Sequence, residues 1–158
     1  MDLVRLPLIL ALVAVSAPAG ATPQDTAYDL LYAVETGNGE AFLGTLTEEL
    51  SGQLTARIEE LRRLVLADGS TVAVVLARFG LTRWELENLP AVDLLGRMLQ
   101  SLDMHSGVDV VEEDVSMKGR EADVTLYWYD GGSVSFGMVW EESSWRIADS
   151  DLFSMMFK

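Results

Sequence analysis

The sequence predicts an α+β fold in which N-terminal helices pack on a curved antiparallel meander of about four strands. Up to residue 104, apolar residues recur every three or four positions, as in amphipathic helices. From residue 108 onward, apolar and polar residues alternate, and glycine-containing turns separate the runs. Because helices that precede such a sheet must cover its apolar face, we expect one two-layer domain over residues 22–158.

Residues 23–36 are predicted to form the first helix. Pro23 suits a first turn, and Asp25 lies where the helix dipole favours an anion. Residues 37–39 read Gly-Asn-Gly and end the helix. A short second helix is expected over residues 40–46.

The third helix is expected to begin after Thr47, which can cap it, and to end before the pair Asp68-Gly69. Its apolar residues keep a spacing of three or four; they are Leu50, Leu54, Ile58, Leu61 and Val65. A stripe of only about two heptads is typical of a helix packed on a core, not of a coiled coil.

Residues 68–104 are predicted to insert extra helices before the sheet. The segment 71–76 is rich in β-branched residues and has strand propensity. Ser70 before it and Gly80 after it are helix start and stop signals, so a helix is the preferred interpretation.

Two further short helices are expected in the same insertion. Thr82 and Glu85 have the spacing of a capping box, and Leu81 and Leu86 have that of a hydrophobic staple. Pro90 then starts another helix. Several short helices in succession are typical of a cap or an insertion.

Four strands are predicted after residue 108. The first contains Val111, Val115 and Met117 and is expected to bulge near residues 112–114. Turns are expected at residues 118–119, 130–132 and 141–143. The apolar residues expected to face the helices from the later strands are Ala122, Val124, Leu126, Trp128, Val134, Phe136, Met138, Trp140, Trp145 and Ile147.

Residues 1–21 are predicted to be a cleavable secretory signal. Arg5 gives a positive n-region, residues 6–15 are apolar, and residues 19–21 read Ala-Gly-Ala, a small-x-small cleavage site. An uncleaved membrane anchor is the alternative, but a span needs about 20 predominantly apolar residues. We therefore expect a periplasmic or secreted protein without a stable membrane anchor after cleavage. Since the chain has no cysteine, it is not expected to be a lipoprotein.

Composition excludes several classes of function. The formal net charge is −14, from 11 basic and 25 acidic residues, so the basic footprint of a nucleic-acid-binding protein is missing. An anionic membrane surface is disfavoured for the same reason. Without cysteine there are no disulfides, thiolate metal sites or cysteine nucleophiles. The charge fits a dispersed exported protein.

Two stretches carry a family resemblance. Within residues 25–47 the turn Gly-Asn-Gly-Glu-Ala-Phe joins two helices, and residues 108–149 form hairpins that close with Ser-Trp-Arg-Ile at 144–147. This pattern resembles the nuclear-transport-factor-two-like superfamily, which includes ketosteroid isomerases, polyketide cyclases and many exported bacterial domains of unknown function. Residues 68–104 depart from the simplest family pattern because they insert helices.

The resemblance implies a curved sheet wrapped around a long helix, with an apolar, aromatic-lined cavity between them. The pocket residues that it implies are Tyr28, Leu31, Tyr32, Leu126, Trp128, Phe136, Met138 and Trp140. Packing in the core is the alternative role for the aromatic members. A small apolar molecule is the expected ligand.

No catalytic residue, cofactor or metal site is predicted. A proton-transfer enzyme of this fold needs a carboxylate inside the cavity, and only Glu113 is a candidate, if the first strand is bulged. The single histidine, His105, cannot build a His-rich zinc site. Asp149 and Asp151 lack the other ligands of a calcium loop. The glycine and serine motifs of nucleotide-binding proteins and hydrolases are missing.

These observations favour an exported, non-catalytic binding or accessory module. Two alternatives stay open: a cavity enzyme of the isomerase or cyclase type, and a structural dimerising domain. An acidic side chain in a sizeable pocket would favour the enzyme, whereas a filled cavity beside an exposed apolar sheet face would favour a homodimer. The apolar tail at residues 152–157 is expected to dock on its own domain or on a second copy.

Overall fold

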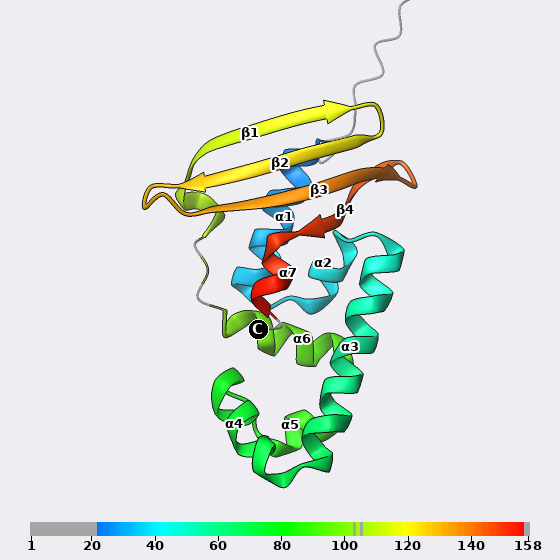
Figure 1. The fold of residues 1–158 in the computed structure, drawn as a ribbon, viewed down its shortest axis with the longest axis vertical. Coiled ribbons are helices and arrows are strands. Elements are labelled where there is room, and N and C mark those ends of the chain that lie inside the picture. The colour runs from blue at the N-terminus through cyan, green and yellow to red at the C-terminus, as the bar shows by residue number, and fades with distance from the viewer. Residues whose placement is uncertain (1–21, 103, 105, 157–158) are drawn as a thin grey trace, which may run out of the picture.

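A computed structural model describes residues 22–102, 104 and 106–156 (Figure 1). The predicted signal at residues 1–21 and His105 lie outside the described residues. The described chain is α+β, with N-terminal helices followed by an antiparallel sheet of four strands, as predicted. In chain order the helices are α1 (Pro23–Thr36), α2 (Gly39–Gly44), α3 (Glu48–Ala67), α4 (Gly69–Phe79), α5 (Arg83–Asn88), α6 (Ala91–Gln100), the 3-10 turn η1 (Gly107–Asp109) and α7 (Asp151–Met156).

The helices begin and end where capping residues predict. The Thr22 hydroxyl accepts a hydrogen bond from the Asp25 amide at the start of α1, and Gly37 ends that helix in the left-handed conformation with φ 63°. The Thr47 hydroxyl caps α3 by accepting from the Leu50 amide at 3.2 Å. Local sequence therefore sets these boundaries before any tertiary contact is considered.

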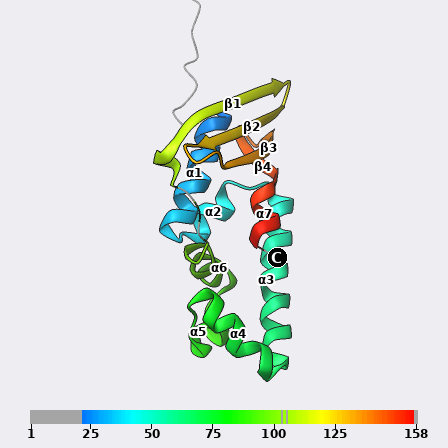
Figure 2. The ribbon, with the colours of Figure 1, turned by 60° about the vertical axis from the view of Figure 1, so that its left-hand side comes forward.

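The inserted segment is helical, as expected, with one correction at its start. The carboxylate of Asp68, not Ser70, caps α4 and accepts from the Ser70 amide at 3.1 Å. Both hydrogen bonds of the predicted capping box between Thr82 and Glu85 are present at the start of α5. Figures 1 and 2 show α3 to α6 extending away from the sheet.

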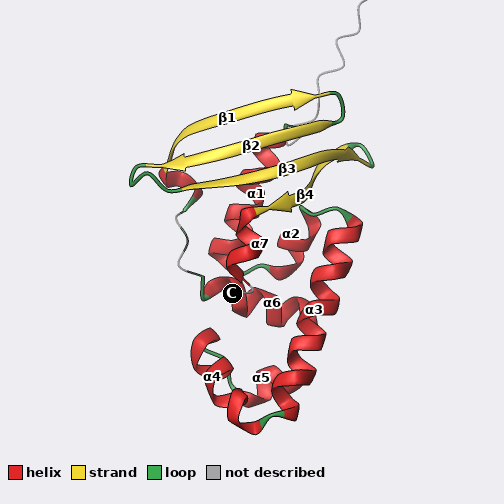
Figure 3. Ribbon diagram, in the orientation of Figure 1, coloured by secondary structure: helices red, strands yellow, loops and turns green. Residues whose placement is uncertain are grey.

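The sheet is a simple meander (Figure 3). Its strands are β1 (Val110–Lys118), β2 (Glu121–Trp128), β3 (Ser133–Glu141) and β4 (Ser144–Ser150), and they lie in the order β1-β2-β3-β4. The register of β1 on β2 shifts between Val110 and Glu112, which indicates a bulge. The bulge was predicted near residues 112–114, so it lies slightly earlier in the chain than expected.

The inward face of the sheet is buried against α1, which packs on β2 and β4. The buried inward residues are Ala122, Val124, Leu126, Trp128, Val134, Phe136, Met138, Trp145 and Ile147. Trp140 is half-buried and meets Trp145 edge to face, with ring centroids 5.4 Å apart. The predicted alternation on β2 and β3 is therefore confirmed.

Residues 45–47 and α7 close the sheet at β4. The Thr47 amide donates to the Ile147 carbonyl at 3.0 Å, and the Ile147 amide donates to the Thr45 carbonyl at 2.9 Å. On α7, Leu152 and Met156 are buried, as expected for a docked apolar segment. Phe153 meets Phe42 edge to face, with centroids 6.3 Å apart.

The helices α2 and α6 meet at a contact that only glycine permits. A Cβ atom on Gly39 would overlap the carbonyl oxygen of Val92, and one on Gly96 would overlap that of Gly37. The backbones therefore touch directly. No helix among the described residues is long and apolar enough to span a membrane.

Candidate functional site

The predicted pocket residues on the sheet are mostly core residues. Leu126, Phe136 and Met138 are buried in the cluster that α1 covers. Trp128 is also buried and donates a hydrogen bond from Nε1 to the Ser106 carbonyl at 3.0 Å. Trp140 lies at the other end of the sheet against Trp145. The structure thus does not gather these side chains around one cavity.

The predicted pocket residues on α1 take three different positions. Leu31 is buried and lines a cavity on the side of α1 toward α6. Tyr28 is half-buried and contacts Glu113 of β1. Tyr32 is 67% exposed. Only Leu31 therefore belongs to the cavity described next.

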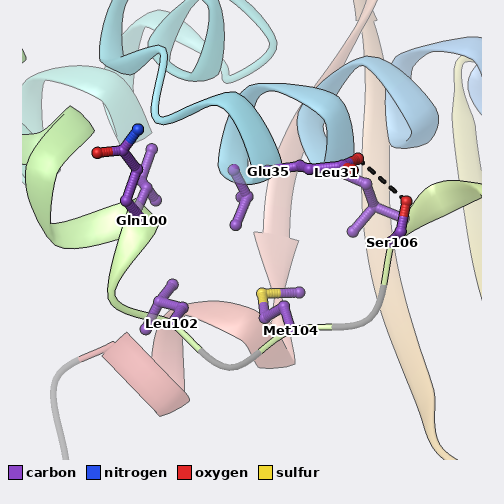
Figure 4. A pocket seen from close by; sticks show the side chains of 8 residues that line it. Leu31, Glu35, Gln100, Leu102, Met104 and Ser106 are labelled. Carbon is purple, nitrogen blue, oxygen red and sulfur yellow. Dashed lines mark hydrogen bonds between the residues drawn. The ribbon is translucent and has the colours of Figure 1, made fainter.

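The candidate site is a cavity of about 190 Å³ between α1, the end of α6 and the segment that leads to η1 (Figure 4). Its lining residues are Leu31, Val34, Glu35, Leu99, Gln100, Leu102, Met104 and Ser106. Five of these are apolar, and Leu31, Val34 and Leu99 are buried. The cavity therefore has an apolar floor supplied by two helices.

Polar groups lie at both ends of the cavity, with Glu35 and Ser106 at one end and Gln100 at the other (Figure 4). The Ser106 hydroxyl donates to the Glu35 carboxylate at 3.0 Å, which joins α1 to the segment before β1. The carbonyl of Ser106 accepts the indole N–H of Trp128, so the same residue is also fixed to β2. Gln100 donates from Nε2 to the Thr36 carbonyl at 3.4 Å. These contacts place a carboxylate and a hydroxyl beside the apolar floor.

Sequence reasoning missed Glu35, although a signal was available. Glu35 follows Leu31 by four residues, so both lie on one face of α1. A carboxylate one turn from a core leucine is placed at the boundary between core and solvent. The remaining walls depend on the positions of Leu102, Met104 and Ser106, which no local pattern predicts.

Glu113 lies on the inward face of β1, as expected if that strand is bulged. It pairs with Leu126, an inward residue of β2, because the bulge at Val111 shifts the register. The Tyr28 hydroxyl donates to Glu113 Oε1 at 2.5 Å. Burial, this hydrogen bond and the negative charge of Glu113 raise the pKa of the Tyr28 hydroxyl to about 12.

The pair of Tyr28 and Glu113 is a structural contact between α1 and β1. Glu113 is exposed and is not among the residues that line the 190 Å³ cavity. A carboxylate that acts on a bound substrate must reach that substrate, and this one is engaged by a phenol outside the cavity. Its geometry therefore gives no support to catalysis by Glu113.

The described residues hold no group of three or more metal-ligating side chains. Asp151 begins α7 and accepts the Ser135 amide at 3.1 Å, so its carboxylate has a role in joining the helix to β3. Asp149 is exposed on β4.

No protein-family model, no curated protein and no solved structure matches this chain.

Proposed function

We propose that this chain is an exported, non-catalytic binding module that holds a small, largely apolar ligand in the cavity between α1 and α6. The observation that carries the proposal is the combination of an apolar floor with a polar end formed by Glu35 and Ser106. Ligand sites are typically concave and apolar, with a few polar groups that fix orientation.

The cavity volume limits the ligand to a small molecule. Ligand pockets for drug-sized molecules usually have about 300–1,000 Å³. The volume here is about 190 Å³, which is below that range. The expected ligand is therefore a single ring or a short alkyl chain.

The polar end formed by Glu35 and Ser106 favours a ligand with a hydrogen-bond donor at one end. The carboxylate of Glu35 accepts hydrogen bonds, and an ammonium or hydroxyl group on the ligand would donate to it. The net charge of −14 attracts cations to the surface and repels anions. A small apolar amine fits both features better than a small apolar acid.

The enzyme alternative has less support. An isomerase or cyclase needs a sizeable pocket with a carboxylate inside it. Here the cavity is small, and the carboxylate that lines it, Glu35, is exposed and already accepts a hydrogen bond from Ser106.

Export and family membership are parts of the same proposal. The charge pattern, apolar run and small-x-small motif of residues 1–21 support a cleaved signal. A helix packed on an antiparallel meander supports the nuclear-transport-factor-two-like resemblance at the level of architecture. Intact-mass measurement of the exported protein tests the first part, since cleavage after Ala21 leaves a chain that begins at Thr22.

Ligand binding is tested by methyl NMR with three probes of similar size: toluene, benzylamine and benzoate. We expect toluene and benzylamine to shift the methyl signals of Leu31, Leu99 and Met104, with dissociation constants of about millimolar for so few atoms. Benzylamine should bind more tightly than toluene, and benzoate should bind least.

A matched pair of variants locates the site. Leu102→Trp fills the cavity and should abolish the shifts, whereas Leu89→Trp places the same ring in a separate depression beside α6 and should leave them unchanged. Equal binding by the two variants, or no shift at these methyls with any probe, would contradict the proposed function.

A further inference from the structure

The two edge strands of the sheet, β4 and β1, differ in the backbone partners that they have on their outer sides. At the β4 edge, Thr45 and Thr47 bond to both backbone groups of Ile147. At the other edge, β1 pairs with β2 alone among the described residues. Figures 1 and 2 show β1 as the strand farthest from α3 to α6. Half of its backbone groups therefore face outward without a strand partner.

The inward face of β1 is also poorly covered. The helix α1 packs on β2 and β4 and reaches β1 through the side chain of Tyr28. Consequently Met117 is 59% exposed, and Val115 is only half-buried. An apolar side chain on an open strand edge is a feature that a second strand would bury.

The regular part of β1 is symmetric about Val115. The bulge lies at Val111 and a left-handed glycine follows at Gly119, so the regular strand spans residues 112–118. When two copies of this segment pair antiparallel with full overlap, Val115 lies opposite Val115 of the second copy. Glu112 then lies opposite Lys118 of the second copy, and this pair occurs twice because the contact is isologous.

Full overlap of residues 112–118 selects this register, and the register pairs opposite charges at both ends of the segment. Acidic side chains on an edge strand deter indiscriminate pairing. In the register centred on Val115, however, both copies of Glu112 meet a lysine, and Glu113 lies opposite Met117. Neither Glu112 nor Lys118 takes part in a salt bridge within the described residues of one chain.

We propose that β1 is a homodimer interface, in which residues 112–118 pair antiparallel with the same residues of a second copy. The result is a continuous sheet to which each copy contributes its four strands. Two chains of net charge −14 repel each other at long range, and salt at about 0.15 M screens this repulsion beyond about 8 Å. Cross-strand pairs at the interface lie well within that distance.

Charge reversal tests the register by native mass spectrometry and sedimentation over a range of protein concentration at physiological salt. We expect the unchanged protein to form dimers. Glu112→Lys and Lys118→Glu should each weaken the dimer by about tenfold or more, since each places like charges opposite each other twice. The double variant should recover the original affinity, and a mixture of the two single variants should form heterodimers in preference to either homodimer.

A control separates the local pair from net charge. Glu142→Lys makes the same change of charge in the exposed turn between β3 and β4. Both lysine variants lower the repulsion between copies, so general electrostatics favours dimers for each. The proposal instead requires that Glu112→Lys weaken the dimer and that Glu142→Lys not weaken it.

The proposal would be overturned if the chain stayed monomeric at all concentrations. It would also be overturned if neither single charge reversal changed the dimer affinity, or if the double variant dimerised as weakly as the single variants. Circular dichroism checks that each variant is folded. The cavity takes no part in this contact, so a failure here leaves the proposed ligand binding untouched.

Discussion

Two methionines on one row of the sheet have different surroundings. Met117 of β1 and Met138 of β3 both lie opposite Ala122 of β2, so all three side chains share the inward face. Met138 is 2% exposed, whereas Met117 is 59% exposed. Both strands place a methionine on this face, but α1 packs on β2 and β4 and contacts β1 through Tyr28, at Glu113. Alternation therefore sets the face of a side chain, and the neighbouring layer decides whether that face is buried.

The largest expected loss of stability is at the buried methionine. Met138→Ala removes buried atoms from the core and should lower the free energy of unfolding by about 2–5 kcal/mol. Met117→Ala makes the same chemical change at an open position and should change it by less than about 0.5 kcal/mol. Urea denaturation at a protein concentration low enough to keep the chain monomeric measures both. Equal losses would mean that β1 is covered as fully as β3.

A second contrast between crowded and open positions lies within α2. Gly39→Ala forces a methyl group against the Val92 carbonyl and should cost about 1–3 kcal/mol of stability, because backbone must move. Gly44 has no atom within 4 Å of an added Cβ, so Gly44→Ala should be neutral or slightly stabilising. Thermal unfolding of both variants checks the pair. A Gly39→Ala variant as stable as the unchanged protein would show that α2 and α6 are not in backbone contact.

A smaller effect is expected at the contact that links α1 to β1. Tyr28→Phe removes the hydrogen bond to Glu113 and should cost about 1 kcal/mol near neutral pH. Because the folded state raises the pKa of the phenol from 10.0 to about 12, the folded protein keeps a proton that the unfolded chain releases. The difference in free energy of unfolding between the unchanged protein and Tyr28→Phe should be complete below pH 10. It should shrink as the pH rises toward 12.

Urea denaturation of both proteins across that alkaline range gives the measurement. A difference that stays constant through pH 12 would mean that Tyr28 does not bond to Glu113.

Much of the fold was predictable because its signals are local. Caps such as Thr47 and Thr82 act within one helical turn, and the alternation around Phe136 is a property of neighbouring residues. The inward position of Glu113 could be predicted only on the condition that β1 contains a bulge. One extra residue at a bulge moves every following side chain to the opposite face of the sheet.

The candidate site was less predictable because it depends on long-range packing. The sequence cannot tell an aromatic residue that lines a cavity from one that fills it, and Phe136 proves to fill the core. Tyr32 follows Tyr28 by one turn, yet it is 67% exposed, whereas Tyr28 is half-buried and contacts Glu113. The actual cavity is lined by Leu102, Met104 and Ser106 together with residues of α1 and α6, and Ser106 is held by hydrogen bonds to Glu35 and Trp128.

Among the described residues, β1 has a strand partner on one side and is covered less by α1 than the rest of the sheet. Residue-resolved hydrogen exchange in dilute protein tests this most directly. We expect every second amide of residues 112–118 to exchange rapidly, because it points away from β2, while the paired amides of β3 stay protected. Uniform protection along β1, equal to that of β3 under conditions where the chain is monomeric, would mean that β1 is not an open edge.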